Sequence, residues 1–452
     1  MDTLTEAARE IPVIGAYDVI VCGGGPAGFV AAVAAREAGA RTLLVERYGF
    51  LGGTGTAGLM VEFGGIHDGE RVIVGGVTHA FLHRLADFGG APMPDAESHR
   101  MVFDPESMMT VCREMVTESG ADLLLHALVV DAVREDGRVA GVVVESKSGR
   151  QAVLGKVVID ATGDGDVAAR AGAAFHVGRP ADGKVQPVTL VVILGNVDTT
   201  RFSRRDVSSL AEQIDRARRE GEWTIPTECL FSAGRVIKRG APDRPREAFF
   251  FINGTNVLDV DATNVRDLTR AELESRRQVE VLVRFLRKRV PGFERCYLHR
   301  TGAQAGIRES RRIRGEYTLT AGEVLAAAHF PDGVVPSHQT VDVHEVTGKR
   351  FEHRCLRPGT HYEIPYRCFL PRGLEGILVS GRCISVDHEA LGSVRRMVTC
   401  MPMGEACGRA AGMAAARGCS LREVSVEELR QVLADAGTAV GDRHAPPGGG
   451  AG

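Results

Sequence analysis

A strand, a glycine-rich turn and a helix follow one another between Tyr17 and Glu46. The apolar run Tyr-Asp-Val-Ile-Val-Cys precedes Gly23, Gly25 and Gly28 in the pattern GxGxxG, and a stretch of small residues begins at Pro26. A second apolar run then ends at Glu46. A chance match is common among 55 glycines, but a strand before the turn and a helix after it make this one specific. The segment predicts a βαβ unit of an α/β, Rossmann-like domain.

Each part of this unit suits a dinucleotide. Gly23 and Gly25 allow a tight turn and a close approach of the backbone to a pyrophosphate, and Gly28 allows the helix to pack on the strand. The helix start at Pro26 and Ala27 directs N–H groups and the positive end of the helix dipole toward that pyrophosphate. Glu46 lies 18 residues after Gly28 and can accept hydrogen bonds from a ribose diol. The negative charge of Glu46 repels a 2′-phosphate and so disfavours NADP, although the positive charge of Arg47 weakens this repulsion.

Composition narrows the class of protein. The 452 residues allow two or three domain-sized cores, and 55 basic against 58 acidic residues give a net charge of −3, which offers no global attraction for nucleic acid. No apolar run is long enough to span a membrane, and the first residues lack the pattern of a secretory signal, so we expect a cytoplasmic protein. The 10 cysteines show no zinc-like spacing. His79 and His83 stand four apart, but we expect no metal site.

The chain divides at changes of pattern. Residues 17–175 hold the βαβ unit, a glycine-rich loop over 48–58 and a series of strands that ends at Asp160. Residues 176–355 are predicted to form an inserted α+β substrate domain with polar, charged helices. A buried strand near Gly376 and an Ala- and Gly-rich helix then resume the first fold over 356–420. The cofactor domain is therefore predicted to be discontinuous, with terminal extensions at 1–16 and 440–452 and a disordered tail.

Several later motifs carry a resemblance to a known family. The Gly23 turn with Glu46, the double glycine Gly52-Gly53, Asp160-Ala-Thr-Gly163-Asp-Gly-Asp166 and Gly381-Arg382 resemble the FAD-dependent oxidoreductases of the glutathione-reductase-type fold. Arg308-Glu-Ser-Arg-Arg-Ile313, Val341-Asp-Val-His344, Ile364-Pro-Tyr366, His388-Glu-Ala-Leu-Gly-Ser393 and Met403-Gly-Glu-Ala406 look like the group named simply FAD-dependent oxidoreductase. The resemblance spans about residues 17–418 and is specific for fold and cofactor rather than for substrate.

The resemblance implies that FAD binds in an extended form. The AMP ribose is expected on Glu46, the diphosphate over Gly25 to Gly28, and the ribityl chain and flavin along the later glycine turns. A helix predicted to begin near Pro402 would direct its N terminus at the flavin, where its dipole stabilises the reduced anion. The expected FAD-binding residues are Gly23, Gly25, Pro26, Ala27, Gly28, Glu46, Arg47, Gly52, Gly53, Thr54, Val129, Ala161, Thr162, Gly163, Asp166, Gly381, Arg382, Met403 and Gly404.

Catalytic candidates come from two regions. Arg308, Glu309 and Arg312, with Arg311, have a spacing that would gather the arginines on one side of a helix. Such a cluster could clamp a carboxylate or phosphate, or it could be a surface ion-pair network. His388 follows the C-terminal strand and is a candidate proton relay, against the alternative of a structural histidine. Arg395 and Arg396, shortly before Met403, could also touch flavin or substrate.

Missing motifs narrow the reaction. No redox C-x-x-x-x-C motif follows the double-glycine loop, so a disulfide relay is not expected. The sequence also lacks a second nucleotide-binding motif, so we expect that NAD(P)H, if it is the electron donor, docks only transiently. The leading hypothesis is hydride transfer between flavin N5 and a small polar or anionic metabolite, as a dehydrogenase, oxidase or ene-reductase. A flavin monooxygenase and an RNA-modifying flavoprotein are the alternatives. We expect a small-molecule substrate, no nucleic acid or membrane partner, and, from the family alone, a homodimer.

Overall fold

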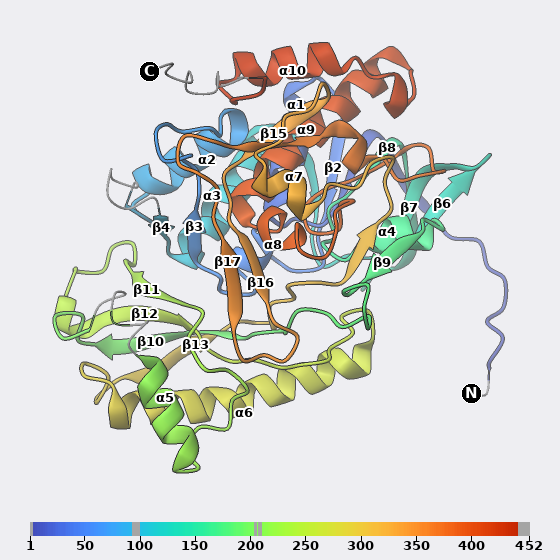
Figure 1. The fold of residues 1–452 in the computed structure, drawn as a ribbon. Helices are drawn as coiled ribbons and strands as arrows, with labels where there is room; N and C mark the ends of the chain where they lie inside the picture. The colour runs from blue at the N-terminus through green and yellow to red at the C-terminus, as the bar shows by residue number, and fades with distance from the viewer. Residues whose placement is uncertain (1–2, 93–99, 203–205, 207–209, 442–452) are drawn as a thin grey trace, which may run out of the picture.

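The protein is described here from a computed structural model that covers residues 3–92, 100–202, 206 and 210–441. Most of the predicted disordered tail therefore lies outside the described residues. Figure 1 shows two parts, a larger one built around a long sheet and its helices, and a smaller one formed by the middle of the chain (green and yellow). Within the described residues, no helix has the length and apolar character needed to cross a membrane.

The central sheet follows the sequence prediction. Its strands lie in the order β5-β2-β1-β8-β7-β6, with β19 beside β8. The pairs β5–β2, β2–β1, β1–β8 and β8–β19 are parallel, whereas β8–β7 and β7–β6 are antiparallel. Its buried strands are continuous apolar runs, as both faces of a parallel sheet require. The bounds are β1 Val13–Cys22, β2 Thr42–Val45, β5 Asp122–Leu124, β6 Leu128–Glu135, β7 Arg138–Ser146, β8 Gly149–Asp160 and β19 Ile377–Val379.

Two helices from opposite ends of the chain pack closely beside this sheet. They are α1 (Pro26–Glu37) and α9 (Met397–Arg417). A Cβ on Gly404 would lie 2.0 Å from the Ala27 carbonyl oxygen, and a Cβ on Gly408 would lie 2.4 Å from that of Ala31. Glycines therefore let the two backbones touch, which joins the first and last parts of the chain into one core. The other helices of this part are α2 Gly76–Asp87, α3 Pro105–Glu118, α4 Asp166–Arg170, α7 Ala321–Leu325, α8 Leu391–Val394 and α10 Val426–Asp435.

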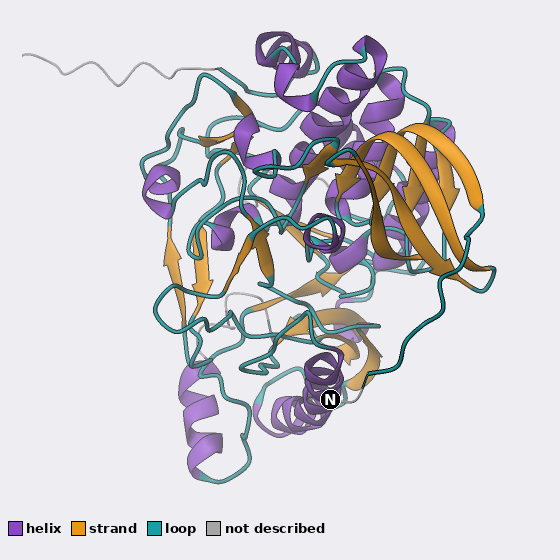
Figure 2. Cartoon of the chain, turned by 90° about the vertical axis from the view of Figure 1, so that its right-hand side faces the viewer, coloured by secondary structure: helices purple, strands orange, loops and turns teal. Residues whose placement is uncertain are grey.

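The middle of the chain forms a second sheet with its own core. Four antiparallel strands lie in the order β11-β12-β10-β13. The long helix α6 begins where the Asn264 side chain accepts backbone N–H groups, and its Leu282, Phe285 and Leu286 belong to the core of this sheet. Figure 2 shows the helices of this second part at the end of the molecule away from the twisted first sheet. The bounds are β10 Val191–Val197, α5 Leu210–Arg219, β11 Ser232–Val236, β12 Ala248–Asn253, α6 Val265–Arg289 and β13 Tyr297–Thr301.

Short strand pairs connect the two parts. The hairpin of β16 and β17 descends from the larger part to the second sheet, in orange in Figure 1. The second core draws on residues from Leu190 to Cys296, whereas Val334 and Val335 belong to the first core. The exact limits at 176 and 355 stay a prediction. The short strands are β3 Glu62–Gly64 with β4 Arg100–Val102, β9 Phe175–Val177 with β14 Arg311–Ile313, β15 Gly333–Ser337 with β18 Tyr362–Pro365, and β16 Val341–His344 with β17 Phe351–Arg354.

Two local predictions were wrong. Residues 308–312 do not form a helix, because the backbone runs in a loop and then as strand β14 paired with β9. The C-terminal helix begins at Met397 rather than near Pro402, which lies inside α9. Proline favours the first helical position, but Pro402 lies five residues beyond the start of α9, where its missing N–H removes one helical hydrogen bond, so it is a misleading start signal.

Candidate active site

A cavity of about 1500 Å³ lies at the carboxyl ends of the parallel strands. Gly23 follows β1, Glu46 follows β2, Ala161 follows β8 and Gly381 lies two residues beyond β19, and all four line the cavity. Ligands of open parallel sheets bind at this edge. Typical small-molecule pockets measure roughly 300–1,000 Å³, so this cavity has room for a dinucleotide together with a second ligand.

The first glycine turn forms an open cradle. Gly23 has φ +97°, and a Cβ there would lie 2.6 Å from the Ala161 carbonyl oxygen. A Cβ on Gly28 would lie 1.7 Å from the Gly23 carbonyl oxygen, so Gly28 serves packing rather than the cavity wall. At Gly25 a Cβ would meet only Gly53 Cα, at 3.9 Å. No side chain caps the N terminus of α1, whose N–H groups are available to an anion.

Glu46 is fixed at the other side of this cradle. Its Oε2 accepts the Gly24 N–H at 2.6 Å, and its Oε1 accepts the Tyr48 N–H at 2.9 Å. The carboxylate is nearly buried, and each oxygen keeps a further lone pair for a diol. Arg47 lines the cavity nearby and donates to the Gln304 side-chain oxygen at 2.6 Å.

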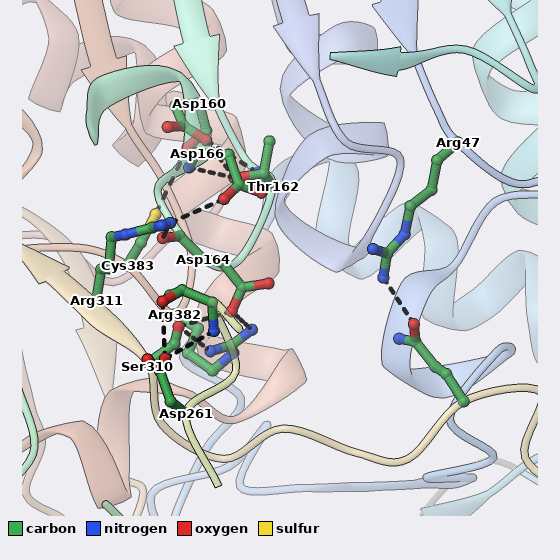
Figure 3. Close-up of polar contacts among 12 residues, drawn as sticks. Arg47, Asp160, Thr162, Asp164, Asp166, Asp261, Ser310, Arg311, Arg382 and Cys383 are labelled. Carbon is green, nitrogen blue, oxygen red and sulfur yellow. Dashed lines mark hydrogen bonds and ion pairs between the residues drawn. The ribbon is translucent and has the colours of Figure 1, made fainter. Parts of the chain in front are cut away.

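The turn after β8 is held by the carboxyl groups of the buried Asp160 and the partly buried Asp164 (Figure 3). Asp160 accepts the Thr162 hydroxyl at 2.6 Å and the Ala168 N–H at 2.9 Å, and burial raises its pKa to about 6. Asp164 accepts Arg382 Nη2 at 2.8 Å and the Ser310 hydroxyl at 2.6 Å. Burial alone would raise the pKa of Asp164, but Arg382 and Ser310 outweigh it and lower that pKa. The turn is thereby fixed against the segment after β19.

Asp166 begins α4 and also faces the cavity. Its carboxylate pairs with Arg311 at 2.8 Å, a contact visible in Figure 3. Burial and the charge of Asp164 raise the pKa of Asp166.

Most predicted cofactor residues meet in this one cavity. Met403 and Gly404 do not, because α9 begins earlier and Gly404 packs on α1, while Met397, Val398 and Cys400 line the cavity in their place. Gly28 and Gly52 are also absent from the lining, although Gly52 donates its N–H to Gly24. The predicted residues that line the cavity are Gly23, Gly25, Pro26, Ala27, Glu46, Arg47, Gly53, Thr54, Val129, Ala161, Thr162, Gly163, Asp166, Gly381 and Arg382.

Comparison with known proteins gives the family. The model of the FAD dependent oxidoreductase family matches residues 18–433. This chain belongs to that family. The open cradle at Gly25, the uncapped start of α1 and the fixed carboxylate of Glu46 fit FAD, which is the cofactor of this flavoprotein. When bound, FAD supplies a site that accepts or donates a hydride.

Two relatives that match by sequence each cover about a third of the flavoprotein. Digeranylgeranylglycerophospholipid reductases 2 and 1 of Methanopyrus kandleri are 33% identical over 154 residues and 32% identical over 155 residues. Each match covers 32% of this chain, and the chain spans 37% and 40% of the two reductases. A geranylgeranyl bacteriochlorophyll reductase-like protein of Thermoplasma acidophilum aligns with a TM-score of 0.49 and 13% identity, covering 93% of this chain and 84% of that one.

Three arginines line another part of the cavity. Arg308 donates to the Pro187 carbonyl oxygen at 2.7 Å, and Arg395 and Arg396 share Asp342, whose Oδ2 lies 2.5 Å from Arg396 Nη2 and 3.4 Å from Arg395 Nη2. Burial and then the charge of Arg395 lower the pKa of Arg308 to about 9, and burial lowers that of Arg395 to about 10. Both side chains therefore remain cationic at neutral pH.

Two histidines flank the same carboxylate. Asp342 Oδ1 lies 3.0 Å from His353 Nε2 and 3.6 Å from His344 Nε2. Burial alone would raise the pKa of Asp342, but Arg396 and His344 hold it well below its usual range. Burial and the charge of Arg308 lower the pKa of His344 to about 3, so this imidazole is neutral at pH 7.

The remaining catalytic candidates lie behind the arginines that line the cavity. Glu309, Arg312 and His388 do not line the cavity. They form a buried cluster in which Glu309 pairs with Arg312 and lies 2.9 Å from His388 Nδ1. Glu309 also accepts the Gln186 N–H at 3.0 Å, and Gln186 Oε1 accepts Arg395 at 3.4 Å. This arrangement supports positioning of Arg395 rather than contact with substrate.

The sequence offered no reason to assign a catalytic or cofactor-binding role to several residues that line the cavity. Asp342, His344 and His353 belong to the β16–β17 hairpin, and Phe231 precedes β11. Asp342 and His353 face each other across this hairpin, whereas only the docking of the hairpin on the second sheet brings Phe231 to them. The motif Val341-Asp-Val-His344, which carried part of the family resemblance, was the one available signal.

Proposed function

We propose that this flavoprotein transfers a hydride between FAD and a small polar or anionic metabolite bound against Arg308, Arg395 and Arg396. The observation that carries the proposal is the continuity of the cavity. One space of about 1500 Å³ is lined both by the FAD-binding turns and by the three arginines. A ligand on the arginines would share this cavity with the cofactor, as hydride transfer requires.

Charge supports an anionic ligand. Among the described residues, the ion pairs of Arg395 and Arg396 meet one carboxylate, that of Asp342, which also lies near Arg308. The Nε atoms of Arg395 and Arg396 are buried and have no hydrogen-bond partner among the described residues. Buried cations are costly unless an anion compensates them, and a substrate carboxylate or a similar group would do so.

The proposal is tested by reduction of the flavin. The isolated holoprotein is mixed in a stopped-flow instrument, without oxygen, with a broad panel of hydroxy, amino and unsaturated acids. We expect at least one compound to bleach the oxidised flavin, or, if the reaction runs as an ene-reductase, to reoxidise flavin reduced by dithionite. Failure of the whole panel in both directions would contradict the proposal. Product oxygenation that requires NAD(P)H and O₂ would instead identify a monooxygenase.

A further inference from the structure

Aromatic rings stand beside the arginines in the cavity wall. The Phe231 and Phe351 ring centroids lie 6.0 Å apart, and His344 packs edge-to-face on Phe231 at 4.6 Å. The His353 ring centroid lies 4.6 Å from that of Phe351. All four rings line the cavity and come from the hairpin and from the start of the second sheet. This end of the cavity therefore presents flat, partly apolar surfaces.

Arg308 joins the rings to the charged groups. Its guanidinium carbon lies 5.0 Å from the Phe231 ring centroid, within the range of a cation–π contact. The residue is only 6% exposed. Within the described part of the chain, its guanidinium donates one hydrogen bond, to the Pro187 carbonyl oxygen. An arginine has five N–H donors in a planar fork, so most of those of Arg308 remain available to a ligand.

The surrounding charge favours an anion over a cation. Arg395 and Arg396 extend the positive wall, and Asp342 is already engaged by Arg396 and His353. No group of three metal-binding side chains occurs among the described residues, and the three arginines would repel a cation. A guanidinium fork pairs best with a planar carboxylate, through two parallel hydrogen bonds.

Resting on the proposed function, we infer that the substrate is a carboxylate attached to a flat aromatic or conjugated body. The carboxylate binds Arg308 with the help of Arg395 and Arg396. The flat body packs against Phe231 and Phe351, where edge-to-face or offset contacts with a second ring are favourable. The two recognition elements lie together because the Arg308 guanidinium is in contact with the ring of Phe231.

The test uses binding alone and requires no turnover. The FAD-loaded protein is titrated calorimetrically with benzoate, benzamide and inorganic phosphate, and the visible flavin spectrum is recorded in parallel. Benzoate is expected to bind and to perturb the flavin absorbance. Benzamide has the same ring without the charge, so we expect it to bind at least about tenfold more weakly, the loss of one charged contact. Phosphate, which lacks the flat body, is expected to bind more weakly than benzoate.

Matched variants assign the contact. Arg308→Met and Arg395→Met should each weaken benzoate binding by roughly tenfold or more while FAD content stays that of the wild type. Arg308→Lys keeps the charge without the fork and should recover only part of the affinity. Phe231→Leu should weaken benzoate binding more than phosphate binding. Arg284→Met, on the exposed face of α6 outside the cavity, is the control and should change nothing.

Several results would overturn the inference. Equal affinity for benzoate and benzamide, tighter binding of phosphate, or unchanged benzoate binding in folded Arg308 and Arg395 variants would each do so. If a nonaromatic polar metabolite reduced the flavin and benzoate did not bind, the proposed function would stand and this substrate class would be wrong. If benzoate bound through the arginines but no compound in any panel reacted with the flavin, the binding site would stand and the proposed function would be wrong.

Discussion

At the scale of single residues, Glu405 shows how burial changes the chemistry of a carboxyl group. It lies inside α9 and is 1% exposed, and its Oε2 accepts the Val77 N–H at 3.0 Å near the start of α2. Arg409 lies 3.5 Å away. Burial raises the pKa of Glu405 to about 7, and the charge of Arg409 only partly opposes this effect. In the folded protein the protonated form is therefore favoured below about pH 7.

Stability should consequently depend on pH through Glu405. The folded state holds this proton up to about pH 7, whereas the unfolded chain releases it near 4.5, so the folded state binds more protons between these values. Stability contributed by Glu405 is then fully present below about 4.5 and is lost as the pH rises through about 7. We expect Glu405→Gln, always neutral, to melt at a higher temperature than the wild type at pH 8 but not at pH 5.

Thermal unfolding at the two pH values checks this prediction. A tenfold difference in proton affinity between the folded and unfolded chain corresponds to roughly 1.4 kcal/mol, so the gain at pH 8 should be on the order of a few kcal/mol. Glu427→Gln, on the exposed side of α10, serves as the control and should show the same small difference at both pH values. A Glu405→Gln variant that melts below the wild type at pH 8 would refute the assignment.

At the scale of elements, the contact of α1 with α9 couples the cofactor cradle to the end of the chain. Gly404→Ala would place a methyl group 2.0 Å from the backbone oxygen of Ala27, which cannot move as a side chain would. The helices must separate, at a cost of roughly 1–3 kcal/mol or more. Because Ala27 lies in the first turn of α1, we expect both a lower melting temperature and a lower FAD content. Absorbance of the purified protein in the visible flavin band, relative to its protein absorbance in the ultraviolet, measures the second effect.

Gly322→Ala on α7 is the matched control. A Cβ there would meet only the Thr320 hydroxyl at 3.9 Å, so the same substitution has space. Alanine is favoured over glycine in helices by up to about 1 kcal/mol, so this variant should be neutral or slightly stabilised with a full load of FAD. If Gly404→Ala behaved identically, close packing of α1 on α9 would not be required for cofactor binding.

The elements also show what the sequence could reveal. The β1–α1–β2 unit was predictable because strand, turn and Glu46 lie within one continuous segment and each has a local signature. Two failures came from local signals that tertiary structure overrides: Pro402 sits inside α9, and the arginines at 308–312 lie on a loop and a strand. Helical spacing of charged residues does not by itself establish a helix when the backbone instead pairs with β9.

At the scale of the whole molecule, the site is assembled from segments that are distant in sequence. The part of the cavity lined by arginines combines Arg308 from the loop before β14 and Arg395 from the segment before α9 with Asp342 from the β16–β17 hairpin. A single sequence marks such residues only by type, so Arg308 and Arg395 could be nominated, whereas the rings of Phe231 and Phe351 could not. Their meeting depends on how the second sheet docks against the hairpin.

This assembly makes FAD a link between the parts of the fold. The cavity walls come from the β1, β2 and β8 turns, the segment after β19 and the start of α9, so FAD binding should stabilise all of them together. At a free FAD concentration roughly 100 times the dissociation constant, the gain in stability is about 2.7 kcal/mol. FMN lacks the AMP half that fits Glu46 and the Gly25 cradle. We therefore expect FAD, but not equimolar FMN, to raise the melting temperature of the apoprotein.

Limited proteolysis of the apoprotein with each flavin supplies a second readout of the same linkage. FAD should slow cleavage both near the glycine turns and in the segment after β19, because one ligand contacts walls contributed by both. FMN should protect the flavin end of the cavity at most. Equal stabilisation by FMN and FAD would show that the AMP half adds no binding energy. In that case the contacts of Glu46 with Gly24 and Tyr48 would serve the turn alone, and the cradle at Gly25 would have no diphosphate to hold.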